Sequence, residues 1–127
     1  MRVSIGYAVS PQGRGLAYAR FAGAGGGRVV CCSFSAGPQE RGAGYAALAA
    51  MLPVVRRHTA KAAIEIEDAE LVAELTTRCG VPVALMLPHV QARCALNALD
   101  SWKLIAGDGP RDLSARALAE VSLSVAA

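Results

Sequence analysis

Short apolar runs separated by glycine-bearing turns make up the first third of the chain. Residues 3–9 are rich in β-branched and aromatic side chains and end at a Ser-Pro-Gln-Gly turn. Similar runs follow at residues 15–21 and 28–34, with four glycines among the five residues 23–27 that separate them. Runs of this length that are bounded by Gly and Pro predict β-strands. Because the links are short, we expect the three strands to form an antiparallel meander.

The hydrophobic period changes after Gly37. The chain is then rich in Ala and Leu up to residue 59, and Tyr45, Leu48 and Leu52 recur at helical spacing. This spacing lets one face of a helix pack against a core. A helix over residues 39–59 is therefore predicted directly after the meander.

The second half of the chain mixes both periods. Residues 62–67 alternate between apolar and acidic side chains, which is typical of a strand. Asp68 follows in the place of a helix N-cap, and the helix that it begins is expected over residues 69–78. Residues 81–87 are apolar without alternation, as in a strand covered on both faces. The last two predicted elements are helices, at residues 90–105 and 111–125.

This order of elements predicts an α/β fold built on one mixed sheet. Three antiparallel strands come first, and two parallel strands joined by a helical crossover follow. A five-stranded sheet with helices packed on its faces satisfies this order. The length of 127 residues suits one domain with one core. We expect a single domain over residues 1–127, with residues 110–125 as an additional C-terminal helix.

Composition narrows the class of protein. The chain is 54% hydrophobic, but much of this fraction is Ala. None of its apolar runs approaches the roughly 20 residues that a membrane helix needs. Residues 1–6 carry one positive charge and no long apolar stretch, so they predict the start of a strand and not a signal peptide. We therefore expect a cytoplasmic protein that makes no contact with a membrane.

The chain is mildly basic, with a formal net charge of +3. Its basic cluster consists of Arg56, Arg57, His58 and Lys61. The favoured interpretation of this cluster is a solvated helix end. The alternative is a nucleic-acid surface in which Arg93 joins Arg56, Arg57 and Lys61.

The chain contains four cysteines, and none of their spacings resembles a zinc site or a redox pair. Cys31 and Cys32 are adjacent in a predicted strand, so their side chains should point to opposite faces. We expect these two residues, together with Cys79 and Cys94, to be small buried hydrophobes in a reducing compartment.

Three segments follow one another along these elements in a familiar order. They read Ala-Gly-Tyr-Ala-Ala-Leu at residues 43–48, Ile-Glu-Ile-Glu-Asp-Ala-Glu-Leu-Val at residues 64–72, and Pro-His-Val-Gln-Ala-Arg-Cys at residues 88–94. In order and spacing, the chain from residue 3 to residue 102 resembles the bacterial type 1 ribonuclease H family. The resemblance implies a ribonuclease H-like fold.

In that family, four acidic residues hold two divalent cations that hydrolyse RNA in RNA–DNA hybrids. The resemblance puts the first acid position at Ala8 in the first strand and the second at Gly44 in the first helix. Asp68 falls at the third position. Ala95 falls at the fourth, near the start of the helix after strand five. Because Ala and Gly cannot ligate a metal, the resemblance implies a catalytically inactive domain without a cofactor.

Two other interpretations keep chemistry near Asp68. Glu67 and Glu70 could rebuild an acidic site with Asp68 for Mg²⁺ or Mn²⁺, which would make the chain a metal-dependent nuclease. His89 matches a loop position where family members can carry a histidine that assists proton transfer. The favoured interpretation of Asp68 is a helix cap alone.

The predicted third strand, residues 28–34, is apolar, lacks Pro and carries one charge. The resemblance implies that it lies at the edge of the sheet, where an unprotected strand can pair with another chain. We therefore expect a binding or assembly module that forms a homodimer, or binds a protein partner, through this edge or an apolar helix face. Nucleic-acid binding without cleavage is a further alternative.

Overall fold

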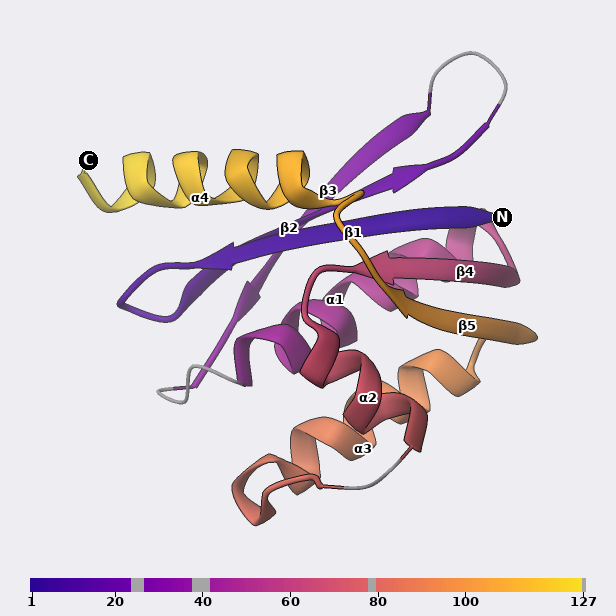
Figure 1. Ribbon diagram of the computed structural model, residues 1–127. Coiled ribbons are helices and arrows are strands. Elements are labelled where there is room, and N and C mark those ends of the chain that lie inside the picture. The colour runs from indigo at the N-terminus through magenta and orange to yellow at the C-terminus, as the bar shows by residue number, and fades with distance from the viewer. Residues whose placement is uncertain (24–26, 38–41, 78–79, 127) are drawn as a thin grey trace.

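A computed structural model of the chain describes residues 1–23, 27–37, 42–77 and 80–126. Cys79 and the first three residues of the predicted helix 39–59 lie outside the described residues. Within these ranges the chain forms one five-stranded sheet with helices on both faces (Figure 1). The strands are β1 (Arg2–Val9), β2 (Arg14–Phe21), β3 (Arg28–Ser35), β4 (Lys61–Ile66) and β5 (Ser101–Ala106).

The strands lie in the order β3-β2-β1-β4-β5. β1, β2 and β3 form an antiparallel meander, in which Leu16 lies opposite Ala8 on one side and Ser33 on the other. β4 runs parallel to β1, with Val3 opposite Ile64, and β5 runs parallel to β4. The mixed sheet predicted from the order of elements is therefore confirmed.

The helices divide unevenly between the two faces of the sheet. They are α1 (Gly42–His58), α2 (Ala69–Thr77), α3 (Met86–Asn97) and α4 (Arg111–Ala126). Figure 1 shows α4 alone on one face and α1, α2 and α3 on the other. α1 packs against β1, β2 and β3, whereas α4 packs against β1 and β2.

The fifth strand is not where the sequence pattern predicted it. Residues 81–87 do not form a covered strand: Val83–Leu85 is a 3₁₀ turn, and Leu87 lies in the first turn of α3. Val83 is 90% exposed and Leu87 67% exposed, so this apolar run is not buried on both faces. The predicted helix 90–105 is also wrong in its second half, because α3 ends at Asn97 and β5 follows.

Side chains of β1 alternate between two cores. Val3 and Ile5 point toward α1 and join a large cluster with Ile64, Leu48 and Leu52. A smaller cluster lies under α4, where Tyr18, Leu113 and Ala117 pack together with Ala8 and Leu16 at their margin. The face to which a β1 side chain points therefore decides which helices it can meet.

The start of α4 lies directly against the backbone of β1. A Cβ atom added to Gly6 would lie 2.5 Å from the backbone N of Ser114 and 2.8 Å from the carbonyl O of Pro110. The loop between β5 and α4, residues 107–110, contacts the buried side chain of Glu65 on β4. The N–H of Gly109 donates a hydrogen bond to this carboxylate at 3.4 Å. These contacts fix where the first turn of α4 sits over the sheet.

The two edges of the sheet differ in character. β3 forms one edge, and its residues Val29, Cys31 and Ser33 are exposed. β5 forms the other edge and carries an exposed lysine, Lys103. The position of the third strand at an edge is confirmed.

The cysteines differ from the prediction in their burial. Cys31 and Cys94 are exposed, which contradicts the expectation of buried hydrophobes. Cys32 is half-buried against the larger core, so Cys31 and Cys32 do point to opposite faces. Among the residues that the structure describes, no helix is long and apolar enough to span a bilayer.

Candidate functional site

A small hollow lies where β4 ends beside the middle of β1. The two strands are parallel with Ser4 opposite Glu65, so β4 ends at the level of Ile5 while β1 continues to Val9. The first turn of α4 lies against β1 at the same place. The hollow has a volume of about 300 Å³, and its lining residues are Ile5, Tyr7, Glu67, Asp68 and Ser114.

Tyr7 is the β1 side chain that faces Gly44. A Cβ atom added to Gly44 would lie 2.7 Å from the Tyr7 hydroxyl and 2.7 Å from a methyl carbon of Leu71. Ala8, the position assigned by the resemblance, points to the opposite face and packs at the margin of the cluster under α4. The phenol therefore occupies the space in front of α1.

The environment of Tyr7 keeps its phenol neutral. Burial, together with the smaller effects of the nearby carboxylates of Asp68 and Glu67, raises the pKa of Tyr7 to about 12. A neutral phenol can donate a hydrogen bond, but it is a poor ligand for a hard divalent cation.

Asp68 caps α2, as its sequence position predicted. Its Oδ1 accepts hydrogen bonds from the backbone N–H groups of Glu70, at 3.0 Å, and Leu71, at 3.2 Å. These two donors have no partner within the helix, and an N-cap carboxylate satisfies them. One oxygen of this carboxylate is therefore already engaged by the backbone.

The structure brings together only part of the acidic set proposed around Asp68. Glu67 lies in the same hollow, and its Oε2 is 3.6 Å from Nε of Arg111. Glu70 is exposed and does not line the hollow. Within the described ranges, no group of three or more His, Cys, Asp or Glu side chains is arranged to hold a metal ion.

The placement of Ala95 near the start of the helix after strand five is wrong. That helix is α4, and the residue that it contributes to the hollow is Ser114. Ala95 lies in α3, before β5, and lines a different hollow. The alternation of polar and apolar residues over 101–104, followed by the Gly-Asp-Gly-Pro turn at 107–110, is the sequence signal that would have located β5 and hence Ser114.

His89 does not lie in a loop beside Asp68. It is a buried residue of α3, and its Nε2 lies 3.0 Å from the carbonyl oxygen of Glu74, to which it donates. Its ring meets the edge of the Tyr45 ring at a centroid distance of 5.9 Å. These contacts join α3 to α1 and α2, so His89 packs the helical layer.

The predicted basic residues are divided among three places. Arg56 and Arg57 line one hollow of about 400 Å³ between α1 and α3. Arg93 donates through Nη1 to the carbonyl oxygen of Leu75 at 2.8 Å, and its guanidinium lies 5.2 Å from the ring centre of Trp102. Lys61 begins β4 and does not line this hollow.

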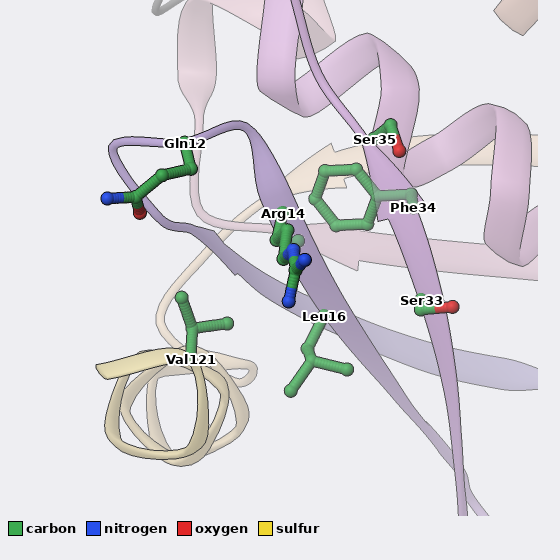
Figure 2. A pocket seen from close by; sticks show the side chains of 8 residues that line it. Gln12, Arg14, Leu16, Ser33, Phe34, Ser35 and Val121 are labelled. Carbon is green, nitrogen blue, oxygen red and sulfur yellow. The ribbon is translucent and has the colours of Figure 1, made fainter. Parts of the chain in front are cut away.

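The sequence pattern gave no sign of a further hollow of about 730 Å³ beside β3. Figure 2 shows Leu16 and Val121 approaching from β2 and α4, with Arg14 beside them and Ser33 and Ser35 along β3. Opposite Ser35 and Phe34 in the ladder are Arg14 and Gly15. Because an added Cβ at Gly15 would overlap the Phe34 ring, the missing side chain is what lets this ring fold over β2.

Solved structures identify the architecture. Ribonuclease H1 from the halophilic archaeon Halobacterium salinarum NRC-1 aligns over 93% of this chain and 91% of its own, with a TM-score of 0.65 and 17% identity. The chain has a ribonuclease H-like fold. The N-terminal ribonuclease H domain of Rv2228c from Mycobacterium tuberculosis, solved as a fusion with maltose-binding protein, aligns over 92% of this chain and 95% of its own, with a TM-score of 0.63 and 15% identity.

These similarities concern the fold. No protein-family model matches the chain, and no curated protein matches it. The similarities do not extend to the residues of the hollow, where Tyr7, Glu67, Asp68 and Ser114 are the polar lining residues and Tyr7 also faces Gly44 of α1.

Proposed function

We propose that this chain is a catalytically inactive ribonuclease H-like domain that acts as a binding or assembly module in the cytoplasm. The observation that carries the proposal is the contact between Tyr7 and Gly44. A phenol fills the space in front of α1, and α1 offers no side chain at that position. The Tyr7 ring thus fills the space beside Gly44 that a side chain on α1 could otherwise enter.

The residues in and beside the hollow do not suit a pair of divalent cations. Mg²⁺ and Mn²⁺ need several oxygen ligands, and carboxylates compensate their charge. Tyr7 and Ser114 offer neutral hydroxyls, and Gly44 offers nothing. Of the two carboxylates, Asp68 already accepts two backbone hydrogen bonds and Glu67 lies beside the guanidinium of Arg111. We therefore derive no metal-dependent step for this site.

The alternative is a nuclease with a site rebuilt from Asp68, Glu67 and Glu70. Its weakness is geometric, because Glu67 lies next to Arg111 and Glu70 lies outside the hollow. A second alternative is nucleic-acid binding without cleavage. The shared hollow of Arg56 and Arg57 favours it, since two guanidinium groups there could contact phosphates.

A cleavage assay with two variants at one residue separates these functions. The protein, Asp68→Asn and Asp68→Ala are incubated with a labelled RNA–DNA hybrid and Mg²⁺ or Mn²⁺, with Asp100→Asn as an exposed control. We expect no cleavage by any of them. Asn is as good a helix cap as Asp, so Asp68→Asn should keep its thermal stability, whereas Asp68→Ala should lose about 1 kcal/mol.

Metal-dependent cleavage that disappears in Asp68→Asn would refute the proposal and establish the rebuilt site. A shift of the hybrid on a native gel, without cleavage, would support the nucleic-acid alternative if it weakens with salt and with Arg56→Ala. Asp68→Ala would still report on the helix cap in either case.

Assembly is proposed to involve the bare strand β3. The exposed side chains of Val29, Cys31 and Ser33 lie along an edge that no described strand or helix covers. A strand with unpaired backbone groups and a single charge is a template for pairing with another strand. A second copy of this chain carries a matching strand, and a homodimer is the assembly that we propose.

A further inference from the structure

The free backbone groups of β3 belong to alternate residues. In an antiparallel ladder, the groups of every second residue point toward the neighbouring strand. The N–H of Ala36 donates to the carbonyl oxygen of Gly13 at 2.9 Å, so the even-numbered residues of β3 face β2. The N–H and C=O groups of Val29, Cys31 and Ser33 therefore point outward, away from the sheet.

The same three residues share a face of the sheet. Their ladder partners on β2 are Arg20, Tyr18 and Leu16, and Tyr18 and Leu16 pack on the α4 side. Val29, Cys31 and Ser33 therefore point to the α4 side as well. They lie beyond the area that α4 covers, since α4 packs on β1 and β2.

Val29 and Ser33 are each two residues from Cys31 along β3, and they differ in what they present to a partner. Val29, two residues before Cys31, is an apolar side chain that is 39% exposed. Ser33, two residues after Cys31, lies at the wall of the 730 Å³ hollow (Figure 2). Next to Ser33 the lining of that hollow includes the apolar side chains of Leu16 and Val121, with Arg14 beside them.

We propose that a second copy of this chain pairs with β3 in the antiparallel register that places the two Cys31 residues opposite each other. This inference rests on the proposed self-association and specifies its geometry. In this register Val29 of each copy lies opposite the partner's Ser33. Each valine then extends the row formed by Leu16 and Ser33 at the margin of the hollow.

The arrangement is self-complementary, which is what a two-fold interface requires. In such an interface, residue i of one copy meets residue j of the other, and j meets i. Here Val29 of each copy would meet Ser33 of the other, so the same contact forms twice. The only charge on the strand, Arg28, is at one end, so antiparallel pairing keeps the two arginines at opposite ends. A second copy therefore satisfies both the shape and the charge of this edge.

The register predicts a cross-link at one cysteine and not at its neighbour. Directly opposite residues in this kind of pair have Cα atoms about 5.5 Å apart, which lies within the range that a disulfide spans. One variant keeps only Cys31, with Cys32, Cys79 and Cys94 changed to Ser, and the matched variant keeps only Cys32. Diamide oxidation should give several-fold more covalent dimer with Cys31 than with Cys32.

A second pair of variants tests the contact made by Val29. Val29→Lys should raise the dissociation constant of the dimer by about tenfold, since it replaces two symmetric apolar contacts by two charges. Val83→Lys, at an exposed valine of the 3₁₀ turn, should leave it unchanged. Both are measured by analytical ultracentrifugation, and thermal melts followed by circular dichroism verify that every variant is folded.

The outcomes separate the register from self-association itself. A monomeric mass at all micromolar concentrations would refute both. A dimer that forms cross-links at Cys32 in preference to Cys31, or that Val29→Lys leaves intact, would refute this register and leave self-association standing. Preferential cross-linking at Cys31 together with weakening by Val29→Lys would support it.

Discussion

At the scale of single residues, Tyr7 and Gly44 form one packing unit. The phenol of Tyr7 is large enough to occupy the volume that a side chain on the first turn of α1 would need. Neither residue can be changed without affecting the other, because protein interiors contain little empty volume. A side chain added to α1 at residue 44 would therefore have to displace the Tyr7 ring.

A double-mutant cycle measures this dependence. Gly44→Glu should lower the free energy of unfolding by about 1–3 kcal/mol, since the new side chain must displace Tyr7 and Leu71. The cost should shrink in a Tyr7→Ala background, where space is available. Urea unfolding of the four proteins gives both values.

Gly42→Glu is the matched control, because the nearest atom to a Cβ added there is a Leu85 methyl carbon at 4.0 Å. It should change stability far less than Gly44→Glu. An equal cost for Gly44→Glu with and without Tyr7 would show that the two side chains do not compete for the same space.

Around the hollow, the sequence located Asp68 correctly but not the β1 residue that faces α1. The helix cap at Asp68 depends on the next three residues only, and the structure confirms it. Which residue of β1 faces α1 depends on strand register, where a shift by one residue exchanges the two faces. The resemblance selected Ala8, while the alternation of buried side chains puts Tyr7 in front of α1.

At the scale of elements, the position of α4 depends on close contact with β1. Gly6 lies beneath the first turn of α4, and the atoms nearest to an added Cβ there are mainly backbone atoms, which have little freedom to move away. Leu113 and Ala117 then bury the following turns against Tyr18. α4 is thus seated by its first two turns.

Substitution of Gly6 tests this seating. Gly6→Ala should destabilise the protein by about 1–3 kcal/mol, because one methyl group forces helix and strand apart. Gly23→Ala serves as the control, since an added Cβ there meets nothing within 4 Å. The two variants are compared by chemical unfolding. Equal stability of the two would mean that α4 tolerates displacement from the sheet.

The elements that the sequence misplaced share one cause. Residues 81–87 are apolar, but apolar character without alternation does not distinguish a covered strand from the start of a helix. Leu96, Leu99 and Trp102 also fit a helical spacing, which hid the end of α3 and the start of β5. The alternation of exposed Lys103 with buried Leu104 was the correct signal.

At the scale of the whole molecule, the proposed dimer links folding to concentration. A species that forms only from folded chains raises the apparent stability as protein concentration rises. We expect the melting temperature to increase over a hundredfold range of concentration, and the increase to be smaller for Val29→Lys than for Val83→Lys. A melting temperature that is constant for the unchanged protein would contradict the linkage.

The sequence predicted the bare edge, but the hollow beside it depends on where β2 and α4 meet.

Lys103 lies on β5, the edge strand opposite β3, and it bears on how many copies could join one sheet. Pairing at β3 would consume that edge in both copies and leave β5 outermost at each end of a continuous sheet. Exposed lysines on outer strands oppose the addition of further chains, because the charge would have to be buried or brought near another. The stoichiometry would then stop at two, and no filament would grow from the ends.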